Sequence, residues 1–236
     1  MNIKNVTLGN LAVAGFLFNS LTPYNNSLVN FRLATDDKID LNIQEHRDAL
    51  INWLNDWGCR HLSKAYHHIA SQSILDWYQT NYASLVSEKM PLWQLEDKEI
   101  ETVVNAYGSL KDKTGALRVR GGSEQEVHIG PTAASKILFA IRPKALMPWD
   151  EAMRISFECD GSPESYSKYL IKIRDLTLHI EHLCRGKGFP IDALLQKLGR
   201  SNSTVLVLVN EYIWVTETRK VVLPSSETLL RWASLE

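Results

Sequence analysis

The spacing of apolar residues along the chain predicts a fold built mostly of α-helices. Between residues 42 and 57, apolar side chains recur at helical intervals, and Gly58 follows as a typical helix stop. Comparable spacing predicts core helices over residues 11–18, 63–85, 98–106, 131–141, 150–157, 165–184, 190–198 and 225–232. Asp97 is expected to cap the helix that begins at Lys98.

Two other segments are harder to assign from their pattern. The run TVLVLV within residues 203–218 is β-branched and fits a strand, but the apolar pattern continues to Trp214, beyond the usual length of a strand. We therefore predict a buried helix there. The segment TPYNNS, residues 22–27, has the composition of a turn.

The helical pattern breaks between residues 108 and 123. This stretch holds four glycines and four cations, and Leu117 and Val119 alternate with Arg118 and Arg120. Alternation of this kind predicts a short β-hairpin near residues 115–121, within a basic surface loop.

Composition limits the classes of function. The three cysteines lie far apart and form no C-x-x-C pair, and no apolar run approaches the length of a membrane span. We therefore expect a cytoplasmic protein with no membrane contact, no metal and no other cofactor. The net charge is −1, but residues 107–200 hold 15 Lys and Arg against 11 Asp and Glu. This modest basic stretch is compatible with DNA as a partner.

Residues 127–154, VHIGPTAASKILFAIRPKALMPWDEAMR, combine a glycine turn, a helix, a proline-bounded loop and an aspartate. Gly130, Thr132 and the alanines that follow resemble the second helix of the hairpin in the helix-hairpin-helix DNA glycosylase superfamily. Asp150 stands 18 positions after Thr132, which matches the family's spacing to its aspartate. The resemblance implies a single two-lobed helical domain over residues 1–236, with the active cleft between its lobes.

Two departures from the family pattern bear on mechanism. His128 stands where the family's hairpin carries its first glycine, and Thr132 stands where bifunctional members carry a nucleophilic lysine. The resemblance implies that the backbone of this turn, around His128 and Gly130, binds a DNA phosphate. It also implies catalysis by Asp150, whose carboxylate would stabilise the positive sugar and activate water. Without an amine at position 132, the expected enzyme is monofunctional and leaves an abasic site.

The other expected site residues surround this centre. Thr132 and Lys136 lie one helical turn apart, so both are expected to face the cleft, with Lys136 contacting phosphate or solvent. Trp149, next to Asp150, is the expected stacking surface for an extruded base, and Tyr24 and Asn25 are candidates for reading its edge. Arg118 and Arg120 would bind phosphates or enter the gap that the base leaves.

The resemblance implies double-stranded DNA with a modified or damaged base as the substrate, and an unusual base such as a hypermodified cytosine of phage DNA fits a role in antiviral defence. Two alternatives remain open. One is a non-catalytic helix-hairpin-helix module that binds DNA or a protein partner. The other is a helical protein unrelated to DNA, in which Gly130 and Asp150 share their spacing by coincidence. Asp150 itself also suits a purely structural role as a helix cap.

Overall fold

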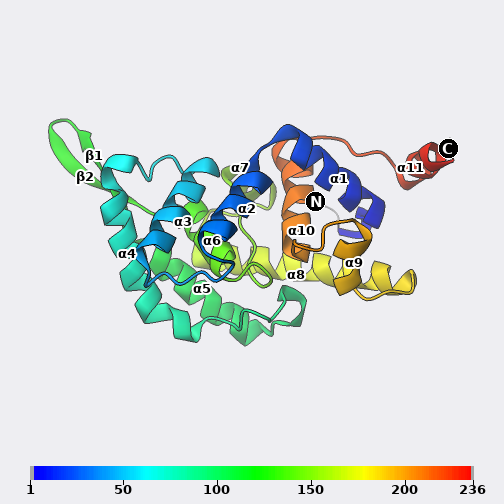
Figure 1. The fold of residues 1–236 in the computed structure, drawn as a ribbon, viewed down its shortest axis with the longest axis horizontal. Helices are drawn as coiled ribbons and strands as arrows, with labels where there is room; N and C mark the ends of the chain where they lie inside the picture. Colours follow the sequence, from blue (N-terminus) through cyan, green and yellow to red (C-terminus); the bar gives the residue numbers. More distant parts are fainter. Residues whose placement is uncertain (1–2, 235–236) are drawn as a thin grey trace.

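The computed structural model describes residues 3–234 and is mostly helical, as the sequence predicts, with one β-hairpin (Figure 1). Short 3-10 turns link several of the helices. The α-helices are α1 (Leu8–Leu21), α2 (Tyr24–Ala34), α3 (Gln44–Asp56), α4 (His67–Asn81), α5 (Asp97–Lys111), α6 (Gly130–Ile141), α7 (Glu151–Ser156), α8 (Pro163–Gly186), α9 (Asp192–Lys197), α10 (Val205–Ile213) and α11 (Ser226–Ala233). The strands are β1 (Thr114–Arg120) and β2 (Ser123–His128).

The helices fall into two groups that share α8. Helix α8, 24 residues long, packs against α5 of one group and α1 of the other. Helices α2 to α6 form the first group, whereas α1 packs against α10 and joins the C-terminal segments in the second (Figure 1). One hydrophobic core runs through both groups without a break in the described residues.

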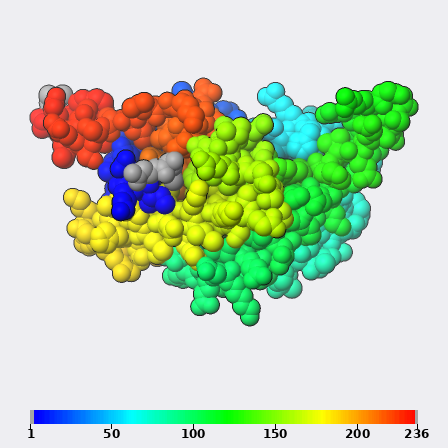
Figure 2. Space-filling view, turned by 180° about the vertical axis from the view of Figure 1, so that it is seen from behind, coloured from blue at the N-terminus to red at the C-terminus, as the bar shows by residue number. Residues whose placement is uncertain are grey.

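The β-hairpin connects α5 to α6 and projects from the body of the protein. Figure 2 shows it, in green, at the opposite end of the molecule from α11, in red. Its strands are antiparallel and turn at Gly121 and Gly122, whose φ angles are +60° and +83°. Two consecutive residues with positive φ suit the tight turns that match the twist of a hairpin, and glycine adopts them readily.

Several boundaries differ from those predicted. The segment TPYNNS is not a turn, because α2 already begins at Tyr24. Glu96 rather than Asp97 caps α5, since it forms a reciprocal capping box with Glu99. Residues 108–111 belong to α5 rather than to the basic loop, residues 112–113 form a turn, and the hairpin runs from Thr114 to His128, beyond the predicted end at residue 121. Residues 205–213 are helical, as predicted, and continue into a π-helical turn at Trp214–Thr218.

The element before Gly130 is strand β2 rather than a helix. Gly130 has a φ of +75°, a conformation that glycine adopts without strain, and this lets the chain turn from β2 directly into α6. The helices on either side of the turn region are therefore α5 and α6, with the whole β-hairpin between them.

A buried carboxylate ties α10 to the N-terminal helices. Glu211 on α10 is fully buried, pairs with Arg200 through both oxygens, and accepts a hydrogen bond of 2.7 Å from the Asn25 amide. The pair lies against Gly15 of α1, where a Cβ atom would come within 2.8 Å of the Arg200 guanidinium. Glycine at position 15 thus lets the ion pair approach the helix closely.

Among the described residues, no helix is both long and apolar enough to cross a lipid bilayer.

We expect Glu211→Ala to lower the free energy of unfolding by about 3 kcal/mol, because it leaves the Arg200 cation without its carboxylate partner and removes one of the two acceptors of the Asn25 amide. Chemical denaturation measures the change. The control is Glu227→Ala, which removes the exposed partner of Arg231 and should cost less than about 1 kcal/mol. Equal effects of the two substitutions would contradict a structural role for the buried pair.

Candidate functional site

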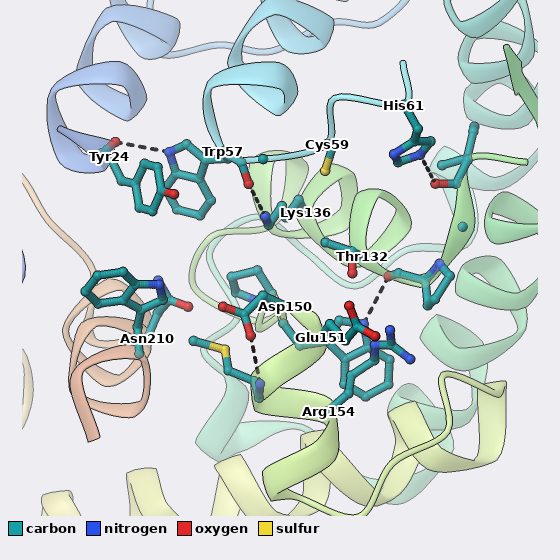
Figure 3. Close-up of a pocket in the computed structure, with 18 of the residues that line it drawn as sticks. Tyr24, Trp57, Cys59, His61, Thr132, Lys136, Asp150, Glu151, Arg154 and Asn210 are labelled. Carbon is teal, nitrogen blue, oxygen red and sulfur yellow. Dashed lines mark hydrogen bonds between the residues drawn. The ribbon is translucent and has the colours of Figure 1, made fainter. Parts of the chain in front are cut away.

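A cavity of about 550 Å³ lies between the two groups of helices. This volume falls in the range of small-molecule binding sites. Segments distant in sequence line it: the ends of α1 and α3, the start of α2, and parts of α6, α7 and α10 (Figure 3). The wall formed by α6 and α7 contains much of the segment 127–154 that the sequence analysis singled out.

Asp150 lies half-buried in this wall as the N-cap of α7. Its Oδ1 atom accepts a hydrogen bond of 2.7 Å from the Met153 backbone amide. The Thr218 hydroxyl, from the π-helical turn after α10, lies 3.1 Å from Oδ2 and 3.3 Å from Oδ1. Two donors from different elements therefore hold the carboxylate in place. Asp150 can cap α7 and also act in the cavity, because the carboxylate that caps the helix also lines the cavity.

The loop before Asp150 is fixed by buried hydroxyl groups. Tyr166 and Tyr169 on α8 donate to the carbonyls of Met147 and Pro148, at 3.1 and 3.0 Å. Burial raises the pKa of both tyrosines well above the usual value, so both remain neutral donors. The backbone immediately before Asp150 is thus anchored to the longest helix of the fold.

Lys136 enters the same cavity from α6. Figure 3 shows its ammonium group and the Asp150 carboxylate on opposite sides of the open space. The lysine is buried, with only 7% of its surface exposed, and its Nζ donates to the Trp57 carbonyl and lies 5.7 Å from the centre of the Trp57 ring. None of the ion pairs between described residues includes Lys136. Its charge is therefore buried without a carboxylate partner.

The Cys59 thiol lies near this ammonium group. Burial raises the pKa of Cys59, and the charge of Lys136 acts in the opposite direction. Because burial is the larger effect, we regard Cys59 as a neutral wall residue rather than as a nucleophile.

Aromatic rings form the side of the cavity next to Lys136. Tyr24 lies with its ring centre 5.9 Å from that of Trp57 and 6.1 Å from that of Trp214. The Trp57 indole donates to the Tyr24 carbonyl at 3.1 Å, which fixes the two rings relative to each other. Phe18 packs edge-on against Trp214. These surfaces suit a flat, unsaturated ligand.

Asn210 adds a polar group to the aromatic side. It is buried on α10 and lines the cavity, and its side-chain amide has no hydrogen-bond partner in the described part of the chain. An amide offers both donors and an acceptor, so Asn210 can read the polar edge of a ligand. Helical periodicity does not single out Asn210, although an Asn beside a Glu inside an otherwise apolar run is a usable signal.

The structure brings together many of the predicted site residues. Tyr24, His128, Gly130, Thr132, Lys136 and Asp150 all line the cavity. Thr132 and Lys136 do face one cleft, as their helical spacing predicts. Lys136 is not a solvent contact, however, because α6 is buried around most of its circumference and takes the lysine inside, whereas its contact with phosphate stays a prediction.

Two predicted pocket residues do not serve as expected. Trp149 touches the cavity but is 1% exposed, and its indole donates to the Pro131 carbonyl while it packs among tyrosines of α5 and α8. Asn25 follows Tyr24 on α2 and faces Glu211 instead, outside the cavity.

Arg118 and Arg120 lie on the exposed hairpin, apart from the cavity wall. In the antiparallel register Arg118 is opposite Gln125 and Arg120 is opposite Ser123. Glu124 and Glu126 are opposite Val119 and Leu117 instead. Because residues directly across a ladder share a face, the hairpin has one basic face without an acid and one face that carries both glutamates.

Comparisons of the chain with protein-family models, with curated proteins and with solved structures find no significant match.

Proposed function

We propose that this protein is a monofunctional DNA glycosylase, in which the cavity receives an extruded base and Asp150 acts at the sugar. One observation carries the proposal: a carboxylate held by two donors faces a cavity of base-binding size with aromatic walls. The 18-residue spacing from Thr132 to Asp150 agrees with the family resemblance. The observed cap supports the proposal further, because it holds the carboxylate in one orientation.

The chemistry requires such a group. Breaking an N-glycosidic bond places positive charge on the deoxyribose, and a fixed carboxylate stabilises that charge more in the transition state than in the ground state. The same carboxylate can accept a proton from an attacking water molecule. Thr132 stands at the family's nucleophile position and has no amine, so water is the proposed nucleophile.

The cavity also fits the physical demands of base extrusion. A base inside a duplex is inaccessible to the enzyme, so it must leave the stack and enter a pocket. Tyr24, Trp57 and Trp214 offer aromatic surfaces that replace the lost stacking, and Asn210 offers a polar amide for the edge of the base. His128 and Gly130 lie at the cavity margin, where the turn into α6 would contact the DNA backbone.

We further propose that the substrate is a modified or damaged base in double-stranded DNA of the cytoplasm. A hypermodified cytosine of phage DNA is the candidate that would make the protein an antiviral enzyme. The cavity volume of about 550 Å³ leaves room for a base larger than the standard four. Incubation with a panel of modified DNAs, including intact phage genomes, and mass spectrometry of released bases test the proposal directly.

A non-catalytic DNA-binding module is the alternative. The basic face of the hairpin is compatible with it, because that face carries Arg118 and Arg120 away from the cavity. The two functions differ in a measurable way: a binding module retains DNA without releasing any base.

We expect Asp150→Asn to reduce base release at least 10²-fold, the usual loss when one electrostatic stabiliser is removed. Asparagine still caps a helix and accepts the Met153 amide, so the fold and DNA affinity should be retained. The control is Asp192→Asn, which alters an exposed aspartate in the first turn of α9, outside the cavity. Wild-type rates in Asp150→Asn would remove Asp150 from the mechanism.

Replacing both hairpin arginines should weaken DNA binding without affecting folding. In Arg118→Ala with Arg120→Ala, the plot of log affinity against log salt should lose about one unit of slope for each phosphate contact removed. Fluorescence anisotropy of labelled duplexes measures it. Lys89→Ala with Lys98→Ala removes the same charge from exposed positions outside the hairpin. If both double variants bind alike, the hairpin does not contact DNA.

The product should be an intact abasic site that breaks only after heat or alkali. Borohydride should trap no covalent adduct, because the Lys136 ammonium donates to the Trp57 carbonyl and Thr132 has no amine. Gel electrophoresis of the DNA reports both results. A trapped adduct that disappears in Lys136→Ala would make Lys136 the nucleophile, and one that persists would assign that role to another amine, such as Lys111 or Lys113.

A further inference from the structure

The cavity places opposite charges on opposite walls. Asp150 approaches from the start of α7, whereas the Lys136 ammonium approaches from α6 beside the aromatic rings (Figure 3). The two groups do not form an ion pair, so the space between them separates a negative pole from a positive one.

The surroundings of Lys136 differ from those of Arg154 and His61, two other basic side chains of the cavity wall. Arg154 donates to the Asp160 carbonyl, although its buried Nε has no partner among the described residues, and the His61 ring is hydrogen-bonded to the Ile129 carbonyl. Lys136, by contrast, lies beside Trp57 and Cys59 in the aromatic part of the cavity. An ammonium group has three protons to donate, and the Trp57 carbonyl accepts only one of them. The remaining donors are available to a ligand.

We propose that Lys136 binds the departing base and stabilises the negative charge that it acquires. This inference rests on the proposed glycosylase function and specifies its substrate class. When the C1′–N bond breaks, its electron pair stays on the base and positive charge develops on the sugar. The Asp150 carboxylate and the Lys136 ammonium thus match the two ends of the dipole that forms in the reaction.

The reaction balances with water as the only co-reactant. Water transfers a proton to the Asp150 carboxylate, and its oxygen forms the new bond to C1′. The base leaves as an anion hydrogen-bonded to the Lys136 ammonium, and it then takes a proton from solvent. Asp150 returns its proton to solvent, so both side chains recover their starting states.

This arrangement selects a chemical class of base. A neutral base with a carbonyl next to the glycosidic nitrogen accepts a hydrogen bond from Lys136 and leaves as a stabilised anion. A base that already carries positive charge, such as 7-methylguanine or 3-methyladenine, is repelled by a buried ammonium. It also gains nothing from the group when it leaves, because it departs neutral. The protein should therefore act on neutral bases and spare cationic alkylated ones.

The test compares base release by the wild-type protein and by Lys136→Met, which keeps the length of the side chain and removes its charge. The substrates are duplexes with a single uracil or 5-fluorouracil, glucosylated phage DNA, and DNA treated with dimethyl sulfate. Lys144→Met is the control, because Lys144 is exposed and lies outside this cavity. Thermal unfolding of each variant checks the fold.

We expect the wild-type protein to release neutral bases at least 10²-fold faster than cationic ones. Lys136→Met should lose about 10²-fold on neutral bases and should slow the poorer leaving group, uracil, more than 5-fluorouracil. A merely structural lysine would slow both equally.

Preferred release of cationic bases, or an unchanged ratio of uracil to 5-fluorouracil release in Lys136→Met, would overturn this role while leaving the glycosylase function intact. The first comparison needs only the wild-type protein, so it decides the question even if the variant fails to fold. A wild-type protein that releases no base from any of these DNAs would overturn the proposed function itself, and with it the role of Lys136.

Discussion

The hydrogen bonds from Tyr166 and Tyr169 to the loop before Asp150 are the constraint on which the site depends. Both hydroxyls come from α8, the helix that packs against both groups of helices, and both are fully buried. A shift of α8 would move the carbonyls of Met147 and Pro148, and with them the cap of α7. The orientation of Asp150 is therefore set by the core of the protein rather than by a mobile loop, which is the preorganisation that electrostatic catalysis requires.

Two buried charged groups lie near the junction of the two groups of helices, and the fold treats them differently. Glu211 is enclosed by Arg200 and Asn25, so its desolvation is offset within the protein. Lys136 has a carbonyl and an aromatic ring but no carboxylate partner. The first arrangement stabilises the contact of α10 with the N-terminal helices. The arrangement around Lys136 leaves a positive charge at the cavity wall, and an electron-rich ligand can neutralise it.

Hydrophobic periodicity predicts most of the helices here because each buries a stripe and exposes the rest, as in α3 and α5. It also places Thr132 and Lys136 on one face. It does not predict the depth at which α6 lies, since that depends on the helices packed around it, and so the burial of Lys136 was missed. Proximity in sequence to Asp150 misled in the case of Trp149, because its indole donates to the Pro131 carbonyl and packs among the tyrosines of α5 and α8. Trp57, Trp214 and Asn210 reach the site only through tertiary packing.

The cost of burying Lys136 is itself informative about the site. An unpaired ammonium in an apolar environment loses hydration that one carbonyl and a ring restore only in part. A methionine at this position would fill similar space without that loss. The fold nevertheless keeps the charge inside a cavity, opposite a fixed carboxylate. It bears the desolvation cost when the cavity is empty and recovers that cost when a ligand supplies the missing acceptor. In the proposed reaction, the same energy that destabilises the empty cavity would favour a bound base whose negative charge grows as its glycosidic bond breaks.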